Sequence, residues 1–186
     1  MSRKPRSLAL AVVALAATLS TSCFDPVHAD EVAALGDEVA GVRTGPTHRP
    51  GQPCLVCHGG KGPGSPEFEI AGTIYEYRDV PSGGVDGITV RLTDVTGHLV
   101  TCVSNRAGNF YVPKDSEGTL YYPLTVELGG PDGGGDPRIK PSGVKSMITT
   151  IGRNAGCAFC HVNNLNSLKP EVKTTHMPHV FLNEAP

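Results

Sequence analysis

Two short cysteine–histidine runs stand near opposite ends of the 186-residue chain. In such a C-x-x-C-H run the two thiols lie about one helical turn apart, so both can form thioethers with the vinyl groups of one porphyrin. The adjacent imidazole then lies under the iron as its proximal ligand. The runs therefore predict two covalently bound c-type haems, with Cys54, Cys57, Cys157 and Cys160 as attachment points and His58 and His161 as iron ligands.

Cysteine pairs of this spacing also bind zinc or act as redox dithiols, and both alternatives are weaker for this chain. Zinc ribbons place their two pairs about 15–20 residues apart, whereas Cys57 and Cys157 are 100 positions apart. Neither pair follows the βαβ pattern that surrounds a thioredoxin-like dithiol. Covalent haem is the favoured interpretation, with zinc or a disulfide as the alternative.

Each haem needs a sixth iron ligand or keeps an open coordination site. His48 lies in a proline-rich loop six residues before Cys54, and a loop that proline stiffens loses less entropy when it ligates. His176 and His179 follow the second run, and one of them, with His176 favoured, is expected to ligate a haem. The alternatives are that His48 is an ordinary loop histidine and that the other two only shield a haem edge.

Met147 and Met177 are further candidate ligands. A methionine would raise the reduction potential of a haem relative to a second histidine. Because spare histidines are present, we expect bis-histidine ligation and low potentials. His98 falls at a predicted hairpin tip, where an ordinary surface histidine is expected.

The first 22 residues have the composition of an export signal, with a basic start and an apolar run over 8–19 that is too short to span a bilayer. Ser20-Thr21-Ser22-Cys23 resembles a bacterial lipobox, although Ser20 replaces the usual leucine. It predicts a lipidated Cys23 that anchors the protein to a membrane. The alternative is an ordinary cut after Ala29, which removes Cys23. Either cut predicts an exported protein, in the periplasm or at the outer membrane or cell surface.

Between the two haem motifs the sequence alternates apolar and polar residues in short runs. Turn sequences separate these runs, which is typical of an antiparallel sandwich. We expect strands near residues 68–74, 88–92, 99–103, 110–112 and 124–128, with a last one within 144–151. The predicted fold class is therefore mainly β: an antiparallel Greek-key sandwich flanked by loop-rich haem-binding segments with short helices.

The chain then divides into five parts, which follow the order of these signals. Residues 31–42 within the second part predict a short amphipathic helix or, alternatively, a flexible tether. Cys102, outside both motifs, is expected to be a buried inert thiol. The parts are an export signal (1–22), a tether and distal-ligand loop (23–53), the first haem motif (54–66), a β-sandwich with a glycine-rich loop at 129–141 (67–151), and the second motif with a C-terminal tail (152–186).

The middle of the chain resembles the carboxypeptidase-regulatory-like, or transthyretin-like, β-sandwich over residues 68–128. The resemblance rests on Ala71-Gly72-Thr73-Ile74, on residues 85–94, on Gly97 and on Asn105-Arg106-Ala107-Gly108-Asn109-Phe110. It implies a Greek-key sandwich that serves as a passive scaffold or adhesion module without catalysis of its own. Together with the flanking motifs, the whole chain resembles exported bacterial dihaem cytochromes built around such a sandwich.

Two iron centres in one small chain suit the relay of single electrons. Acidic residues are scattered singly, and no nucleophile–base set stands out, so we expect an electron-transfer protein with redox partner proteins rather than an enzyme. The net charge is −2 with no basic block outside the signal, which argues against a nucleic-acid partner. The alternatives are a haem enzyme or gas sensor with one open iron site, and a surface module whose protomers self-assemble into haem-stacked polymers.

Overall fold

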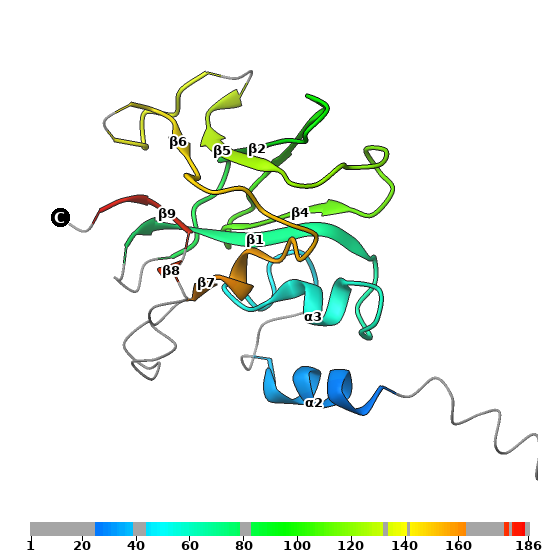
Figure 1. The fold of residues 1–186 in the computed structure, drawn as a ribbon. Helices are drawn as coiled ribbons and strands as arrows, with labels where there is room; N and C mark the ends of the chain where they lie inside the picture. Colours follow the sequence, from blue (N-terminus) through cyan, green and yellow to red (C-terminus); the bar gives the residue numbers. More distant parts are fainter. Residues whose placement is uncertain are drawn as a thin grey trace, which may run out of the picture.

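The computed structural model describes residues 25–38, 44–78, 83–131, 134–140, 142–162, 177–178 and 180–184. Two facing β-sheets form its upper part, and the short helices of the two cysteine–histidine motifs lie below them (Figure 1). The predictions for the export signal, Cys23, His176 and His179 fall outside the described residues.

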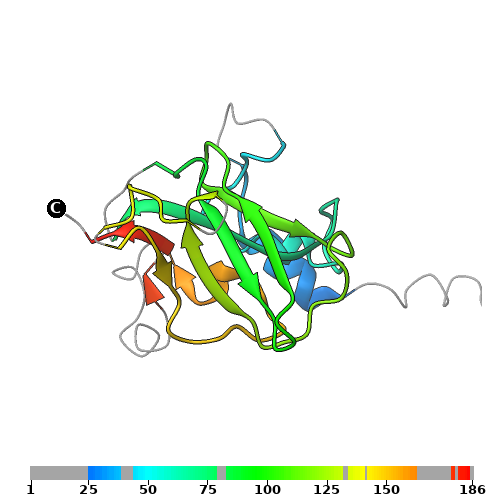
Figure 2. The same cartoon turned by 90° about the horizontal axis from the view of Figure 1, so that it is seen from above.

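One sheet contains three strands in the order β4-β1-β9, and the other contains four in the order β3-β2-β5-β6. Their bounds are β1 Phe68–Tyr77, β2 Thr89–Thr93, β3 Leu99–Val103, β4 Asn109–Pro113, β5 Thr125–Gly129, β6 Lys145–Ser146 and β9 Val180–Asn183. Seen from above, the four-stranded sheet covers β1, with the helices on the far side (Figure 2). The prediction of a mainly β sandwich is confirmed, and each predicted strand of residues 68–128 is present.

The C-terminal tail joins this sandwich in a way that the sequence did not predict. β9 pairs with β1 in parallel, with Ile74 opposite Val180, whereas the other pairs within the two sheets are antiparallel. A parallel pair needs a long connection, which the intervening second sheet and second motif supply. Leu182 of β9 is 1% exposed in the core, so the sandwich extends beyond the predicted boundary at residue 151.

One apolar core fills the space between the sheets because inward residues alternate with outward ones along each strand. The glycine-rich loop contributes Ile139, which is buried with the strand residues. Turn hydrogen bonds such as Ile139 N–H to Asp136 O, at 2.9 Å, shape this loop. Asn183 of β9 holds it against the sheet, since its Nδ2 donates to Arg138 O at 2.8 Å and its Oδ1 accepts from the Lys140 N–H at 2.9 Å. The buried core comprises Ile70, Ile74, Ile88, Val90, Leu92, Val100, Phe110, Val112, Leu120, Leu124, Leu128, Ile139, Ala155 and Leu182.

Helix α2 (Pro26–Ala34) begins earlier than the predicted helix at 31–42. Asp25 caps it by accepting a hydrogen bond from the His28 N–H, and Pro26 occupies its first turn, both of which favour a helix start. No helix of the described residues is long and apolar enough to cross a membrane.

Helix α3 (Cys54–His58) and the 3-10 helix η2 (Cys157–Phe159) carry the two motifs. α3 ends at Gly59, whose N–H bonds to Leu55 O at 2.9 Å. Gly59 and Gly60 directly follow the motif and end this helical turn. Two further short strands, β7 (His161–Val162) and β8 (Met177–Pro178), pair in parallel below β1.

Asp94 organises the predicted β2–β3 hairpin that carries the exposed His98. Its carboxylate accepts hydrogen bonds from the Thr96 hydroxyl (2.7 Å) and from the N–H groups of Thr96, His98 and Tyr121. These bonds, with the Thr96 hydroxyl first, lower the pKa of Asp94 to about 2 because they favour the charged form.

Asp94 should therefore stabilise the fold in a pH-dependent way. Its folded pKa lies below the unfolded value of about 3.9, so its contribution is complete above pH ~4 and is lost as pH falls toward 2. We predict that Asp94→Asn lowers the urea midpoint at pH 5 and that the difference from wild type shrinks as pH falls to 2. An equal difference at both pH values would contradict this role.

Candidate functional site

The two motifs lie side by side against β1. Gly156, directly before the second motif, forms a parallel bridge with Ala71 of β1. The second motif therefore lies along the same edge of β1 that pairs with β9 from Ile74 onward. A Cβ atom on Gly156 would lie 3.5 Å from Leu55 Cδ1 of the first motif. Leu55 and Cys157 both pack against the core cluster. Residues a hundred positions apart in sequence are thus neighbours in the fold.

Gly72 makes this approach sterically feasible. A Cβ atom there would lie 2.8 Å from Cys157 Cβ and 2.8 Å from Phe110 Cζ, closer than carbon atoms pack. A glycine within a strand often marks such a close approach, which is the signal in the sequence that could have indicated this contact. The absence of a side chain at Gly72 therefore lets Cys157 reach β1.

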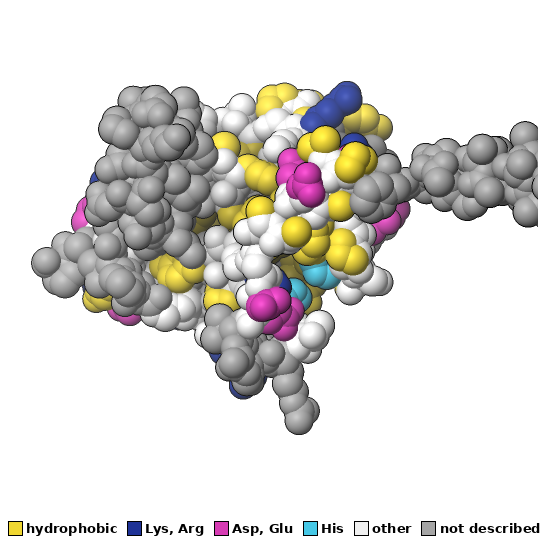
Figure 3. Space-filling model, turned by 90° about the horizontal axis from the view of Figure 1, so that it is seen from below, with side chains coloured by type: hydrophobic (Ala, Val, Ile, Leu, Met, Phe, Trp, Pro, Cys, Tyr) yellow, Lys and Arg dark blue, Asp and Glu magenta, His cyan; other side chains and the backbone are white. Residues whose placement is uncertain are grey.

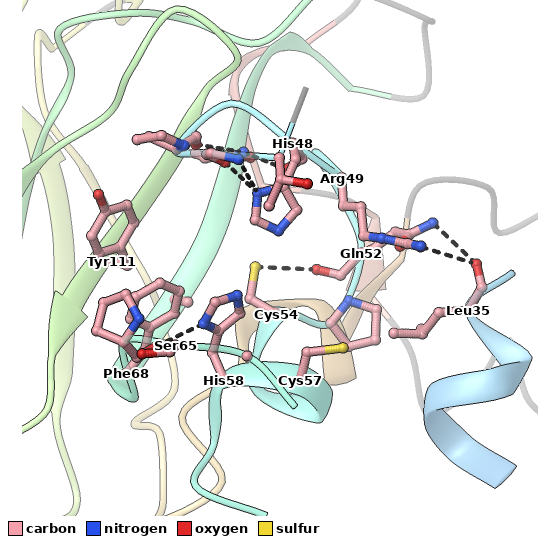
Figure 4. A pocket seen from close by; sticks show the side chains of 18 of the residues that line it. Leu35, His48, Arg49, Gln52, Cys54, Cys57, His58, Ser65, Phe68 and Tyr111 are labelled. Atoms are coloured by element: carbon pink, nitrogen blue, oxygen red, sulfur yellow. Dashed lines mark hydrogen bonds between the residues drawn. The ribbon is translucent and has the colours of Figure 1, made fainter. Parts of the chain in front are cut away.

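A cavity of about 580 Å³ lies beside the first motif. Its volume falls within the range of about 300–1,000 Å³ that small-molecule and cofactor sites usually have. The motif, the preceding loop, two strands and α2 all contribute side chains to it (Figure 4). Histidine atoms are visible among hydrophobic side chains on the underside of the molecule (Figure 3). Principal lining residues are Val32, Leu35, His48, Cys54, Cys57, His58, Phe68 and Tyr111.

Two imidazoles face each other across this cavity. The ring centroids of His48 and His58 are 5.9 Å apart, with the planes tilted by 41°. About 6 Å is the separation expected when two imidazoles bind one metal from opposite sides through bonds of about 2 Å each. The structure thus brings the predicted proximal ligand His58 and the predicted distal ligand His48 into one site.

Backbone groups orient both rings, and a backbone carbonyl sets the tautomer of His58. His58 Nδ1 lies 2.7 Å from Pro66 O, and His48 Nδ1 makes its closest contact with Gly45 O. Because a carbonyl only accepts, the Nδ1 of His58 carries the proton and its Nε2 keeps its lone pair. The Nδ1 of His48 also lies 3.3 Å from the Gly45 N–H, so Gly45 orients this ring through both of its backbone groups. In Figure 4 the Nε2 of each ring points toward the other ring. Metal-binding histidines commonly use such a carbonyl to fix ring orientation.

Aromatic packing and the glycines that follow the first motif also hold the His58 ring, which is 8% exposed. It stacks on Phe68 at 4.3 Å, and Phe68 stacks on Tyr111 at 4.4 Å. Gly64 lies against its other side, since a Cβ atom there would be 2.7 Å from His58 Cγ. The run of glycines after the first motif therefore lets the loop close over the ring.

A second cavity of about 330 Å³ adjoins the second motif, and Phe110 lines both cavities. Cys157, Cys160 and His161 contribute to its wall, as does Met147. His161 belongs to β7, and its backbone pairs with Met177. Met147 therefore lies at the second site, whereas the distal role of His176 and His179 stays a prediction.

A single basic side chain, Lys145, stands among the described residues that line the second cavity. Its Nζ lies 3.3 Å from the centroid of the Phe181 ring, an arrangement in which the ring quadrupole attracts the cation. Burial lowers the pKa of Lys145 because it disfavours the charged form.

The described cysteines are free thiols, so neither C-x-x-C pair forms a disulfide here. Burial raises the pKa of Cys54 to about 11 and that of Cys157 to about 12. Burial likewise raises the pKa of Cys102 to about 12, in agreement with the expected inert thiol. Among the described residues no group of three or more His, Cys, Asp or Glu side chains could hold a metal ion, so these side chains form no zinc-type cluster.

The described residues fit a haem at the first motif. Two thiols and two opposed imidazoles lie together at a mainly apolar cavity there, and they would supply the attachment points and both iron ligands of a haem. At the second motif the two thiols, His161 and Met147 line one cavity. The candidates for a sixth iron ligand at this motif are Met147 and the two histidines outside the described residues, His176 and His179.

The thiol environment predicts slow alkylation of the haem-free folded protein. With a pKa of about 11, Cys54 carries on the order of a hundredfold less thiolate at pH 8.5 than an unperturbed thiol. We expect iodoacetamide to modify Cys54, Cys102 and Cys157 correspondingly more slowly than in urea, as followed by mass spectrometry of peptides. The raised pKa values also stabilise the fold below pH ~8.5, and this contribution is lost as pH rises further. Equal rates in folded and unfolded protein would contradict the burial.

Comparison with known proteins returned no match: no family model, curated protein or solved structure is similar to this chain at a significant level. The carboxypeptidase-regulatory-like resemblance therefore rests on the residues quoted for it alone. The functional interpretation depends on the chemistry of the two motifs and on their arrangement around β1.

Proposed function

We propose that this protein is an exported dihaem c-type cytochrome that relays single electrons between redox partner proteins. The observation that carries the proposal is the pair of opposed imidazoles, His48 and His58, across a cavity that both thiols of the first motif line. A haem bound there supplies a one-electron iron couple, and the protein supplies its ligands, dielectric and spacing.

At the first site, Cys54 and Cys57 would attach the porphyrin, and His58 and His48 would ligate the iron. Pro66 O orients the His58 imidazole and increases its basicity as a ligand, and the backbone of Gly45 orients the His48 imidazole. With both axial positions filled, this site favours electron transfer over the binding of a small molecule.

At the second site, Cys157 and Cys160 would attach the porphyrin and His161 would ligate the iron. The alternative function, a haem enzyme or gas sensor, requires an open iron here. Lys145 is placed to pair with a haem carboxylate, since it is a partly buried cation at the cavity wall.

The adjacency of the motifs supports electron transfer within one chain. Leu55 lies against the backbone at Gly156, and Phe110 lines both cavities. Motifs at opposite ends of the sandwich would have required neighbouring protomers for conduction. This placement favours a self-contained relay over the haem-stacked polymer.

Helix α2 supports cleavage before Cys23 rather than after Ala29. A cut after Ala29 would remove the Asp25 cap and the first turn of α2, leaving too few residues to form a helix. The first cavity is lined by Val32 of α2 and by Leu35 directly after it. We therefore expect α2 to remain in the mature protein. Lipidation of Cys23 would then anchor the protein to a membrane.

Removal of His48 tests the ligand assignment. We predict that reduced His48→Ala protein binds one more carbon monoxide per chain than wild type, because the first iron loses its sixth ligand. Optical titration measures this stoichiometry. His98→Ala, at an exposed hairpin, is the matched control and should bind as wild type does. An unchanged stoichiometry in His48→Ala would exclude His48 as a ligand.

The mass of the mature protein tests export and attachment together. We expect two haems per chain and a first residue of Cys23 that carries a lipid. Cys54→Ser with Cys57→Ser should remove one haem, and the equivalent change at Cys157 and Cys160 should remove the other. A mature chain that begins at Asp30 would contradict the anchor, and a protein without haem c absorption bands would contradict the proposed function.

A further inference from the structure

Two polar side chains on β1 and β4 are buried at the foot of the His48 loop. Thr73 and Asn109 are opposite each other in the β1–β4 ladder and are 5% and 7% exposed. Thr73 Oγ1 donates to Asn109 Oδ1 at 2.8 Å. Buried polar groups destabilise a fold unless they are hydrogen-bonded, so the remaining bonds of this pair show what it serves.

Those remaining bonds go to the backbone on both sides of His48. Asn109 Nδ2 donates to His48 O at 3.0 Å and to Pro46 O at 3.2 Å. Thr73 Oγ1 accepts from the Gly51 N–H at 2.8 Å. The loop from 46 to 51 is thereby bound to the sheet at three backbone atoms, and Figure 4 shows His48 held above the first motif from this loop.

Two neighbouring side chains complete the attachment. Asn105, at the turn before β4, donates from Nδ2 to Pro46 O at 2.6 Å. Arg49, directly after His48, donates to Gly36 O at 2.7 Å and to Gln52 Oε1 at 2.8 Å. The loop is thus held from the sandwich on one side and from the end of α2 on the other.

The position of this network matters because, among the described residues, the His48 ring forms hydrogen bonds only with its own loop. Its Nδ1 contacts Gly45 O, within the same loop, so the ring can stay 5.9 Å from His58 only if the loop itself is fixed. Asn109 satisfies both of its N–H groups only in this loop position. Loss of this amide would remove the direct bond to the His48 carbonyl and one of the two bonds to Pro46 O.

We propose that Asn109, supported by Thr73, is the positioning residue that holds His48 as the sixth ligand of the first haem. This inference rests on the proposed function. It gives the sandwich an active part in the site, whereas the family resemblance implied a passive scaffold. Outer partners of metal ligands typically change metal affinity by about 10–100-fold, and we expect an effect of this size on ligation by His48.

The test compares Asn109→Ala, Thr73→Val, His48→Ala and the Asn109→Ala/His48→Ala double variant in the haem-loaded protein. Each is titrated with carbon monoxide after reduction, and its reduction potentials and thermal unfolding are recorded. Thr101→Ala, on the exposed face of β3, is the matched control. Thr73→Val keeps side-chain volume and removes only the hydroxyl, so it remains informative if Asn109→Ala folds poorly.

We expect Asn109→Ala and Thr73→Val to bind carbon monoxide at the first haem at least tenfold more tightly than wild type, and added imidazole to reverse this. The double variant should match His48→Ala, because residues that act through one ligand are not additive. The inference is overturned if both single variants bind carbon monoxide as wild type does and only unfold at lower temperature. It is also overturned if Asn109→Ala raises carbon monoxide affinity as much in the His48→Ala background as it does in wild type. Absence of haem c bands in wild type would instead refute the proposed function.

Discussion

The close approach of the second motif to β1 is the constraint on which the rest of the site depends. Gly72 and Gly156 both lack a side chain where the backbones meet, and Cys157 fills the resulting space against Phe110. With Cys157 seated there, the first motif packs beside it through Leu55. A side chain at Gly72 would overlap Cys157 and Phe110, so one of these packed residues would have to shift. The two sites are therefore one structural unit and not two appended segments.

The sandwich contributes to this unit in two different ways. Its apolar face supplies the core that fixes β1 and β4 in register, with Gly72 opposite Phe110. Its other face carries Thr73, Asn109 and Tyr111. These side chains face the His48 loop and the first motif. Thr73 and Asn109 hold the His48 loop, and Tyr111 stacks on Phe68, which in turn stacks on His58. Because successive side chains of a strand point to opposite faces, one set of residues in β1 and β4 packs in the core while the alternate set contacts the candidate site.

Much of the fold could be predicted from the sequence because strand periodicity and turn residues are local signals. The strands at 88–92 and 99–103 and the Asp94–Gly97 turn appear where alternation and turn chemistry indicated. β9 could not be predicted in the same way, since it follows the second motif and pairs in parallel across the whole chain. α2 lies nearer the N-terminus than the predicted helix because its start depends on the Asp25 cap and Pro26 and not on apolar periodicity. Asn105 and Asn109 were interpreted as turn residues, and nothing in their spacing points to a loop some sixty positions earlier.

By itself the sequence determined the chemistry of the two motifs: thiol spacing and an adjacent imidazole are covalent features that no fold alters. It also determined a mainly β core, because alternating apolar residues can bury one face only as strands. Only the tertiary structure decided which groups meet. It brought His48 within 5.9 Å of His58, set the motifs side by side on β1, and placed Met147 at the second cavity. Such contacts join residues far apart in the chain, and their geometry follows from packing of the whole core, which local sequence patterns do not contain.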